Sequence, residues 1–177
     1  MCKILSLDVS ASSTGWCFTY DGLNFEKGTI CTKAKLSRAE RLLQYSTLLE
    51  ELLLRLRPDF IVQEDTFSGN NVTTLKILSE FAGVTKLVCK KVLNIESYVI
   101  TNSTVKSYFT SPTKEILFYF VCYLLNINDL TFKKDNDMID AQAQLMCYAD
   151  TILNKYKYRY PKEYGYLYME DQSDEIN

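Results

Sequence analysis

The sequence predicts an α/β domain in which a mixed five-stranded sheet is flanked by helices. Three short strand-like runs open the chain, and polar turns separate them, so they are expected to pair antiparallel. Long helical patterns and strand-like runs then alternate, and a helix between two strands favours a right-handed parallel crossover. The chain has 177 residues, which suits one domain with a genuine hydrophobic core.

The opening strands follow from apolar and aromatic runs. The first run, KILSLDV, is typical of a buried strand, and Asp8 lies near its C-terminal end. The small, polar SASSTGW is turn-like and leads into the aromatic run WCFTY. The pair Asp21-Gly22 is a strong hairpin signal before the third run. We expect these strands at residues 3–9, 16–20 and 24–31.

The first long helix is predicted over residues 36–57. Ser37 and Glu40 form a capping-box pattern at its start, and Pro58 ends it. Leucines recur at helical spacing among Glu and Arg, which is typical of an amphipathic helix. The expected apolar stripe consists of Leu42, Leu43, Leu49, Leu52, Leu53 and Leu56.

The rest of the chain continues the alternation. The run DFIVQE is strand-like and ends in Glu64, and the later DMIDAQAQLMCY is an amphipathic helical pattern. Residues 1–155 are expected to form one domain, and residues 156–177 a Tyr-rich and then acidic tail. The remaining elements are expected as strands at 59–64 and 95–101 and helices at 72–91, 103–109, 113–126 and about 137–154.

Composition excludes several kinds of chemistry. The chain has no His, which rules out Ser-His-Asp, Cys-His and His-metal sites. Its six Cys are scattered without a C-x-x-C motif, which disfavours a zinc site and favours free thiols in a reducing compartment. No apolar run approaches the roughly 18 residues of a membrane span, and the N-terminus does not resemble a signal peptide. Catalysis must therefore come from carboxylates, Lys, Tyr, Cys or a bound metal.

Charge is unevenly distributed along the chain. The formal net charge of −2 includes four acids in the last eight residues, so the rest of the chain carries +2. The part of the chain before these last eight residues can bind DNA if its lysines and arginines gather on one face.

Four acids are expected to converge. Asp8 and Glu64 lie near the C-terminal ends of two strands that should be parallel neighbours, the edge where open α/β sheets bind ligands. Asp137 and Asp140 are three residues apart, so they project from one face of a helix start. Asp135 is expected to precede that helix. The apolar positions that should press the helix against the sheet are Ile139, Ala143 and Met146.

A cluster of four carboxylates implies bound cations. The acids would repel one another and raise at least one pKa, and two divalent ions about 4 Å apart would remove that penalty. Ligation by oxygen alone selects Mg²⁺ or Mn²⁺. A simpler interpretation of an Asp at a helix start, such as Asp137, is a cap or a partner of the helix dipole.

Four motifs carry a resemblance to a known family. They are LDVSASSTGW at 7–16, IVQEDTFSGNNVTTLKILSEFAG at 61–83, TVKSYF at 104–109 and DMIDA at 137–141. Over about residues 3–150 the chain resembles a RuvC-type Holliday junction resolvase of the RNase H-like superfamily. The Ser-rich first motif looks more like bacteriophage or other viral members than like cellular bacterial ones.

The resemblance implies a metal-dependent endonuclease that acts on branched DNA. Such enzymes are homodimers that bind a four-way junction, and each subunit cuts one strand at a symmetric position. Asp8, Glu64, Asp137 and Asp140 match the family's metal-binding acids. Two Mg²⁺ ions, or Mn²⁺ in their place, are implied for each active site.

Other residues match positions that contact DNA. Lys106 matches a catalytic lysine near the scissile phosphate, and Lys114 is a weaker match to a second one. Phe67 matches an aromatic wedge, while Asn70 and Lys76 are further candidates for DNA contacts. The simpler interpretations are solvated lysines and a Phe67 packed in the core.

Alternatives remain open at this point. The chain could be an RNase H-like nuclease for other branched DNA or for RNA–DNA hybrids, or a catalytically silent junction-binding protein. The six Tyr within 156–168 resemble a base-stacking platform but also fit an edge strand or a tail packed on the body, which we favour. A cytoplasmic location is expected, in the host cytoplasm if a phage encodes the chain.

Overall fold

A five-stranded mixed sheet lies at the centre of the fold, with strand order β3-β2-β1-β4-β5. The computed structural model describes residues 2–66, 71–111, 113–156 and 158. The β1–β2 and β2–β3 pairs are antiparallel, and the β1–β4 and β4–β5 pairs are parallel, which confirms the mixed sheet. The strands are β1 Ile4–Asp8, β2 Ser13–Thr19, β3 Glu26–Cys31, β4 Phe60–Glu64 and β5 Tyr98–Ile100.

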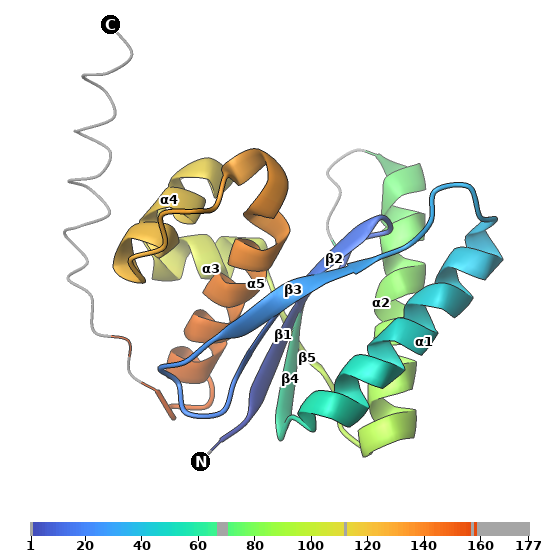
Figure 1. Cartoon of the computed structure of the whole chain (residues 1–177), viewed down its shortest axis with the longest axis horizontal. Coiled ribbons are helices and arrows are strands. Elements are labelled where there is room, and N and C mark those ends of the chain that lie inside the picture. The colour runs from blue at the N-terminus through green and yellow to red at the C-terminus, as the bar shows by residue number, and fades with distance from the viewer. Residues whose placement is uncertain (1, 67–70, 112, 157, 159–177) are drawn as a thin grey trace, which may run out of the picture.

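Helices cover both faces of this sheet (Figure 1). Two helices pack on one face and three on the other, and each group shares a hydrophobic core with the sheet. The first group is α1 Arg38–Leu56 and α2 Val72–Leu93, and the second is α3 Asn102–Tyr108, α4 Lys114–Leu124 and α5 Phe132–Thr151.

The central strand β1 is buried along its whole length because helices lie on both sides of it. Side chains alternate along a strand, so Leu5 and Leu7 enter the core under α1 and α2. Ile4 enters the opposite core, and the hydroxyl of Ser6 on the same face donates a hydrogen bond to Gln144 of α5. Because of this alternation, the side chain of Asp8 lies on the same face of the sheet as Ile4 and Ser6.

Helix α1 begins as the sequence predicts, and Leu49, Leu52, Leu53 and Leu56 of the predicted stripe are buried. Ser37 caps it, and the reciprocal bonds of a capping box with Glu40 are present. The prediction that Leu43 belongs to the core is wrong, because its side chain is 68 % exposed. Tyr45 is fully buried instead and hydrogen-bonds to Thr85 of α2. Position 43 falls outside the face that a regular helix turns toward the sheet.

Helix α5 starts earlier than the sequence suggested, at Phe132 rather than near residue 137. Asp135 therefore lies inside its first turn, and not before the helix as expected, and it accepts a hydrogen bond from the backbone N–H of Thr131 at 2.8 Å. Asp137 and Asp140 lie further along the helix, so Asp137 is not a cap. The polar run KKDND is typical of a loop in the sequence, but the helix continues through it.

The beginning of the C-terminal tail packs against the N-terminus of the domain. The Tyr156 hydroxyl donates to the carbonyl of Cys2 at 2.8 Å and accepts from its N–H at 3.1 Å. The ring of Tyr158 lies 6.2 Å from that of Phe25. The other tyrosines of the tail and its acidic end lie outside the described residues. All six cysteines are free. In the part of the chain that the structure describes, no helix has the length and apolar character of a membrane span.

Candidate active site

Asp8 and Glu64 end two neighbouring parallel strands. Leu7 of β1 pairs with Gln63 of β4, so each acid follows directly at the C-terminal edge of the sheet. By strand alternation Asp8 shares a face with Ile4, and Glu64 shares a face with Val62, whose side chain lies in the core under α5. Both carboxylates therefore meet on the α5 side of the sheet.

Helix α5 approaches this edge closely because β2 carries a glycine there. Gly15 pairs with Asp8, and a Cβ atom at Gly15 would lie 2.1 Å from the backbone oxygen of Asp137. The helix backbone thus rests on the sheet beside Asp8. Asp140, one turn further along α5, is buried, with its side chain 6 % exposed.

Burial and mutual repulsion dominate the electrostatics of Asp8. Removal from water, a hydrogen bond with Glu64 and the charge of Glu64 raise the pKa of Asp8 well above its usual value. The charge of Asp140 acts in the same direction, and Lys114 opposes it. Asp8, Glu64 and Asp140 are therefore close enough for their charges to act on one another, and Asp8 and Glu64 share a hydrogen bond.

Lys114, the first residue of α4, is the cation of this site. Its Nζ lies 2.8 Å from Oδ2 of Asp140. Burial raises the pKa of Asp140, and the charge and hydrogen bond of Lys114 only partly offset this effect. Burial alone would lower the pKa of Lys114, but the charges of Asp8, Asp140 and Glu64 outweigh it and raise the value. Lys114, the weaker of the two sequence matches to a family lysine, is therefore the one that contacts an acid of the site.

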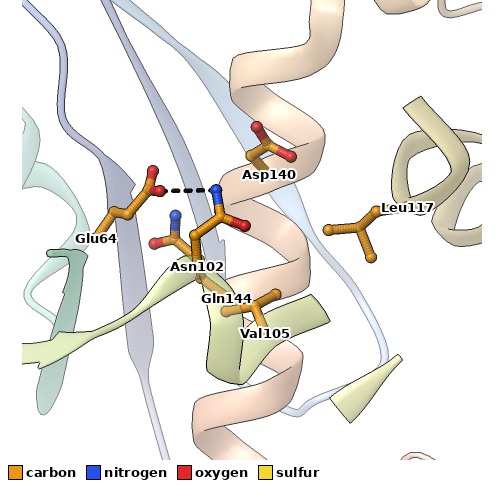
Figure 2. A pocket seen from close by; sticks show the side chains of 6 residues that line it. All are labelled: Glu64, Asn102, Val105, Leu117, Asp140 and Gln144. Carbon is orange, nitrogen blue, oxygen red and sulfur yellow. Dashed lines mark hydrogen bonds between the residues drawn. The ribbon is translucent and has the colours of Figure 1, made fainter. Parts of the chain in front are cut away.

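Two neutral amides complete the site, and the sequence reasoning missed both. Asn102, the first residue of α3, donates from Nδ2 to Oε1 of Glu64 at 3.0 Å. Gln144 lies one turn beyond Asp140 on α5 and accepts the hydrogen bond from Ser6. Figure 2 shows these side chains around a small pocket that Val105 and Leu117 also line. Asn102 lies two residues beyond the end of β5, which is parallel to β4, so the strand-end rule used for Asp8 could have found it.

The structure places the other expected residues as follows. Asp137 is half-buried and acts on Asp140 through its charge. Lys106 lies on α3, half-buried, and does not line the pocket. Lys76 is exposed on α2. Phe67 and Asn70 lie outside the described residues.

The donor set fits a hard divalent cation. Asp8, Glu64 and Asp140 offer only oxygen atoms, the ligands that Mg²⁺ and Mn²⁺ prefer. Burial first, and the neighbouring acids after it, raise the pKa values of Asp8 and Asp140, so a cation beside them would stabilise their charged forms. The fit is one of chemistry: among the residues that the structure describes, no group of three or more Cys, Asp or Glu side chains is placed so that it could hold a metal ion.

The family model and the related sequences all point to the same protein family. Residues 5–148 match the model of the family Crossover junction endodeoxyribonuclease RuvC. The RuvC of Rickettsia typhi is 27 % identical over 161 residues, which cover 86 % of this chain and 99 % of the relative. The RuvC of Alkaliphilus metalliredigens is 29 % identical over 154 residues, which cover 82 % and 92 %.

Solved structures agree in fold. The structure of T. thermophilus RuvC in complex with Holliday junction substrate matches with a TM-score of 0.73 at 16 % identity, covering 89 % of this chain and 99 % of that one. The yeast mitochondrial Holliday junction resolvase Ydc2 matches with a TM-score of 0.60 at 10 % identity, covering 83 % and 77 %. At these identities the likeness establishes the RNase H-like architecture.

Proposed function

The chain belongs to the RuvC family of crossover junction endodeoxyribonucleases, and on this premise we propose that it is a metal-dependent endonuclease that resolves four-way DNA junctions. The observation that carries the proposal is the group of Asp8, Glu64 and Asp140 at the C-terminal edge of the sheet, where burial and then the neighbouring Glu64 raise the pKa of Asp8. All three acids fall within the matched residues 5–148.

The proposed substrate is a Holliday junction or a closely related branched DNA. The T. thermophilus relative was solved with a Holliday junction. A four-way junction has two equivalent strands to cut, so the enzyme acts as a homodimer in which each subunit nicks one of them. The nicks fall at symmetric positions, and a ligase can seal them. The enzyme works in the cytoplasm of the cell that holds the DNA, which is the host if a phage encodes it.

Asp8, Glu64, Asp137 and Asp140 are proposed to hold two Mg²⁺ ions, which Mn²⁺ can replace. When bound, the ions supply Lewis-acid activation of water and stabilise the charge of the departing oxygen. The chain's own groups prepare the site. Asn102 orients the carboxylate of Glu64 through its 3.0 Å hydrogen bond, and the contact of α5 with Gly15 keeps Asp140 beside the strand ends.

Further side chains are proposed to bind DNA. Lys106 contacts the scissile phosphate as a catalytic group, and Lys114 contributes positive charge at the same edge of the sheet. Phe67 stacks on a base where the junction opens, and Asn70 and Lys76 contact the backbone. Together these contacts position the strand to be cut near the acids.

The test of this function uses the Asp8→Asn variant and a synthetic four-way junction. With Mn²⁺ or Mg²⁺ the wild type should nick the junction in two symmetric strands. Asp8→Asn should reduce the cleavage rate by at least about 100-fold, because an amide is a poor ligand for these ions. Binding of the junction, measured by gel shift, should persist.

Asp8→Asn should lower the cleavage rate without lowering the stability of the protein. Asp8→Asn removes one of the buried negative charges that repel each other, so its melting temperature in EDTA should equal or exceed that of the wild type. A variant that binds the junction, melts normally and still cuts would exclude Asp8 from the chemistry.

Parallel substrates separate the alternatives. Linear duplex and an RNA–DNA hybrid should be cut much more slowly than the junction. Equal rates on all three would favour a general RNase H-like nuclease, and binding without any cleavage would favour a silent junction-binding protein.

A further inference from the structure

The acids of the site carry more negative charge than the surrounding groups balance. Asp8 and Asp140 are buried, and Glu64 is half-buried beside them. Asn102, the amide that contacts Glu64, is neutral and supplies hydrogen-bond donors but no charge. A group of carboxylates with little access to water requires a counter-ion close by.

Lys114 supplies that charge. Of the ion pairs formed within the described ranges, only the pair of Lys114 with Asp140 includes an acid of this group. Its Nζ lies 2.8 Å from Oδ2 of Asp140, and the charges of Asp8 and Glu64 also act on it.

The place of Lys114 in its helix strengthens this point. It is the first residue of α4, directly after the cap Thr113. A positive charge at the N-terminus of a helix is unfavourable, because the helix dipole is positive there. The stabilisation of Lys114 therefore comes from the acids across the pocket and not from its own helix.

An ammonium and a divalent ion cannot use the same oxygen in the same direction. Mg²⁺ binds carboxylate oxygen at about 2.0–2.1 Å, inside the distance at which the lysine nitrogen now stands. The side chain of Lys114 is 39 % exposed, so it has room to swing toward solvent.

We propose that Lys114 is an internal counter-ion that competes with the divalent cation for Oδ2 of Asp140 and leaves this oxygen when the ion binds there. This proposal rests on the proposed function, since it assumes that the acids bind a metal. It assigns Lys114 a role in setting metal affinity, in addition to any contact with DNA.

The first experiment compares metal binding by Lys114→Met and the wild type. Methionine keeps an unbranched side chain that is one atom shorter, and it removes the charge. Titration calorimetry with MnCl₂ alone should give about 3- to 10-fold tighter binding for Lys114→Met, the order expected when one positive charge beside the ion is lost. The melting temperature of this variant in EDTA should fall, because the acids lose their counter-ion, and Mn²⁺ should raise it by more than in the wild type.

Two further variants act as controls. Lys114→Arg keeps the positive charge and should bind Mn²⁺ about as the wild type does. Lys133→Met removes a charge from an exposed lysine on the same helix as Asp140 and should leave the affinity unchanged. A general effect of net charge would change both Met variants equally, which would overturn the proposal, as would unchanged or weaker binding by Lys114→Met.

A measurement on the wild type does not depend on how the variants fold. Reductive methylation, followed by mass spectrometry, should modify Lys114 more slowly in EDTA than in Mn²⁺, because the ion pair with Asp140 protects it only without metal. Lys133 should react equally in both. Equal rates for Lys114 would overturn the proposal. If the two rates are equal but the wild type still cuts the junction in Mn²⁺, the counter-ion proposal fails and the proposed nuclease function stands. If the wild type binds Mn²⁺ but does not cut the junction, the nuclease function fails and the counter-ion proposal stands.

Discussion

Gly15 and Asp8 face each other on neighbouring strands, and the missing side chain of Gly15 decides how near helix α5 can come. A Cβ atom added to this glycine would stand 2.1 Å from the backbone oxygen of Asp137, far inside van der Waals contact. The obstacle is backbone within a packed helix, so it cannot rotate away as a flexible side chain would. One residue on β2 thus sets the distance between the acid on the strand and the acid on the helix.

The Gly15→Ala substitution should therefore reduce both stability and activity. Pushing α5 off the sheet disturbs a packed interface, and such overpacking costs about 1–3 kcal/mol. Urea unfolding should show the lower free energy of unfolding, and the junction assay should show slower cleavage.

Gly83 in α2 provides the matched control. A Cβ atom there meets nothing within 4 Å. Gly83→Ala should stabilise the protein by roughly 0.5–1 kcal/mol, since alanine is the better helix former. Loss of stability in both variants to the same extent would contradict the packing argument.

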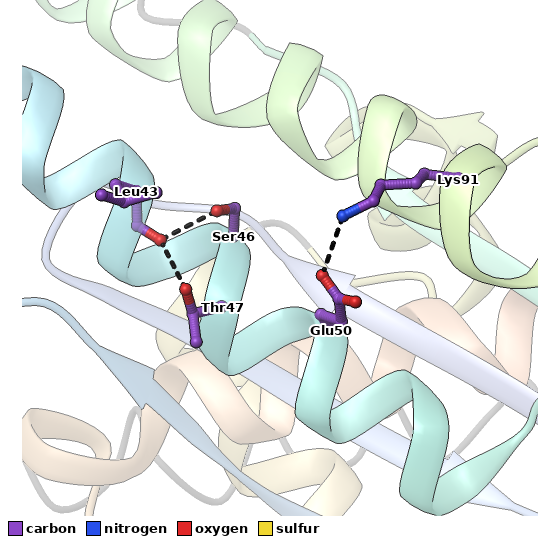
Figure 3. Close-up of polar contacts among 5 residues, drawn as sticks. All are labelled: Leu43, Ser46, Thr47, Glu50 and Lys91. Atoms are coloured by element: carbon purple, nitrogen blue, oxygen red, sulfur yellow. Dashed lines mark hydrogen bonds and ion pairs between the residues drawn. The ribbon is translucent and has the colours of Figure 1, made fainter.

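Among the helices, the pair α1–α2 shows which side chains determine the face that each helix packs against its neighbours. Figure 3 shows Leu43 on α1 with its carbonyl accepting hydrogen bonds from the hydroxyls of Ser46 and Thr47. Lys91 of α2 lies 3.3 Å from Glu50 of α1 across the two helices. This pair is exposed and contributes little to stability, so the buried side chains between the helices and the sheet fix their packing.

The loop between β2 and β3 is held by the carboxylate of Asp21 together with the hydroxyl of Thr19. Oδ1 of Asp21 accepts hydrogen bonds from the backbone N–H groups of Leu23 and Asn24. Gly22, which follows Asp21, has φ +77°. The turn signal in the sequence was correct in place, but the connection is a longer loop closed by Asp21 and not a two-residue hairpin. The bonds from Asn24 and then from Leu23 lower the pKa of Asp21 to about 2.

The stability that Asp21 adds should depend on pH in a defined direction. Its folded-state pKa lies below the ordinary value of 3.8, so the contribution is present above that value and is lost as the pH falls toward about 2. Asp21→Asn keeps the shape of the side chain but not its charge. Melting temperatures of the two proteins should differ near about pH 6 and converge at about pH 2, and a constant difference would contradict the role of the charge.

At the scale of the whole molecule, one sheet supports two hydrophobic cores. Cys17 and Cys147 are buried in the core under α3, α4 and α5, while Cys89 is buried in the core under α1 and α2. Burial raises the pKa of Cys17 and of Cys89 to about 12, and that of Cys147 to about 11. Thiols in this state react slowly with alkylating reagents, because the thiolate is the nucleophile.

Pulsed alkylation in increasing urea should show whether the two cores unfold together. Because β1 contributes side chains to both, Cys89 and Cys147 should become reactive at the same urea concentration, as expected of a two-state domain. The exposed Cys31 should react at every concentration. Earlier exposure of Cys147 than of Cys89, read by mass spectrometry, would instead reveal a separately unfolding unit.

Sequence periodicity was sufficient for most elements but not for all boundaries. Apolar runs located the five strands, and the capping box located the start of α1, but β2 begins at Ser13, inside the polar run that was expected to be a turn. The start of α5 was placed too late, because lysines and aspartates on the solvent side of a helix look like a loop until the partner surface is known. Leu43 was assigned to the core because spacing alone does not say which of two leucine rows faces the sheet.

The order of elements, the mixed sheet and the acids at its C-terminal edge can be predicted from the amino-acid sequence, since they follow from local pattern and from the rule that parallel strands end together. Tertiary structure alone decided the rest. It brought Lys114 onto Asp140 and formed the hydrogen bond of Asn102 to Glu64; the strand-end rule marks Asn102 as a candidate, but no local pattern encodes either contact. The physical reason is that their energies arise from burial beside other charges, and burial exists only once α4 and α5 have packed on the sheet.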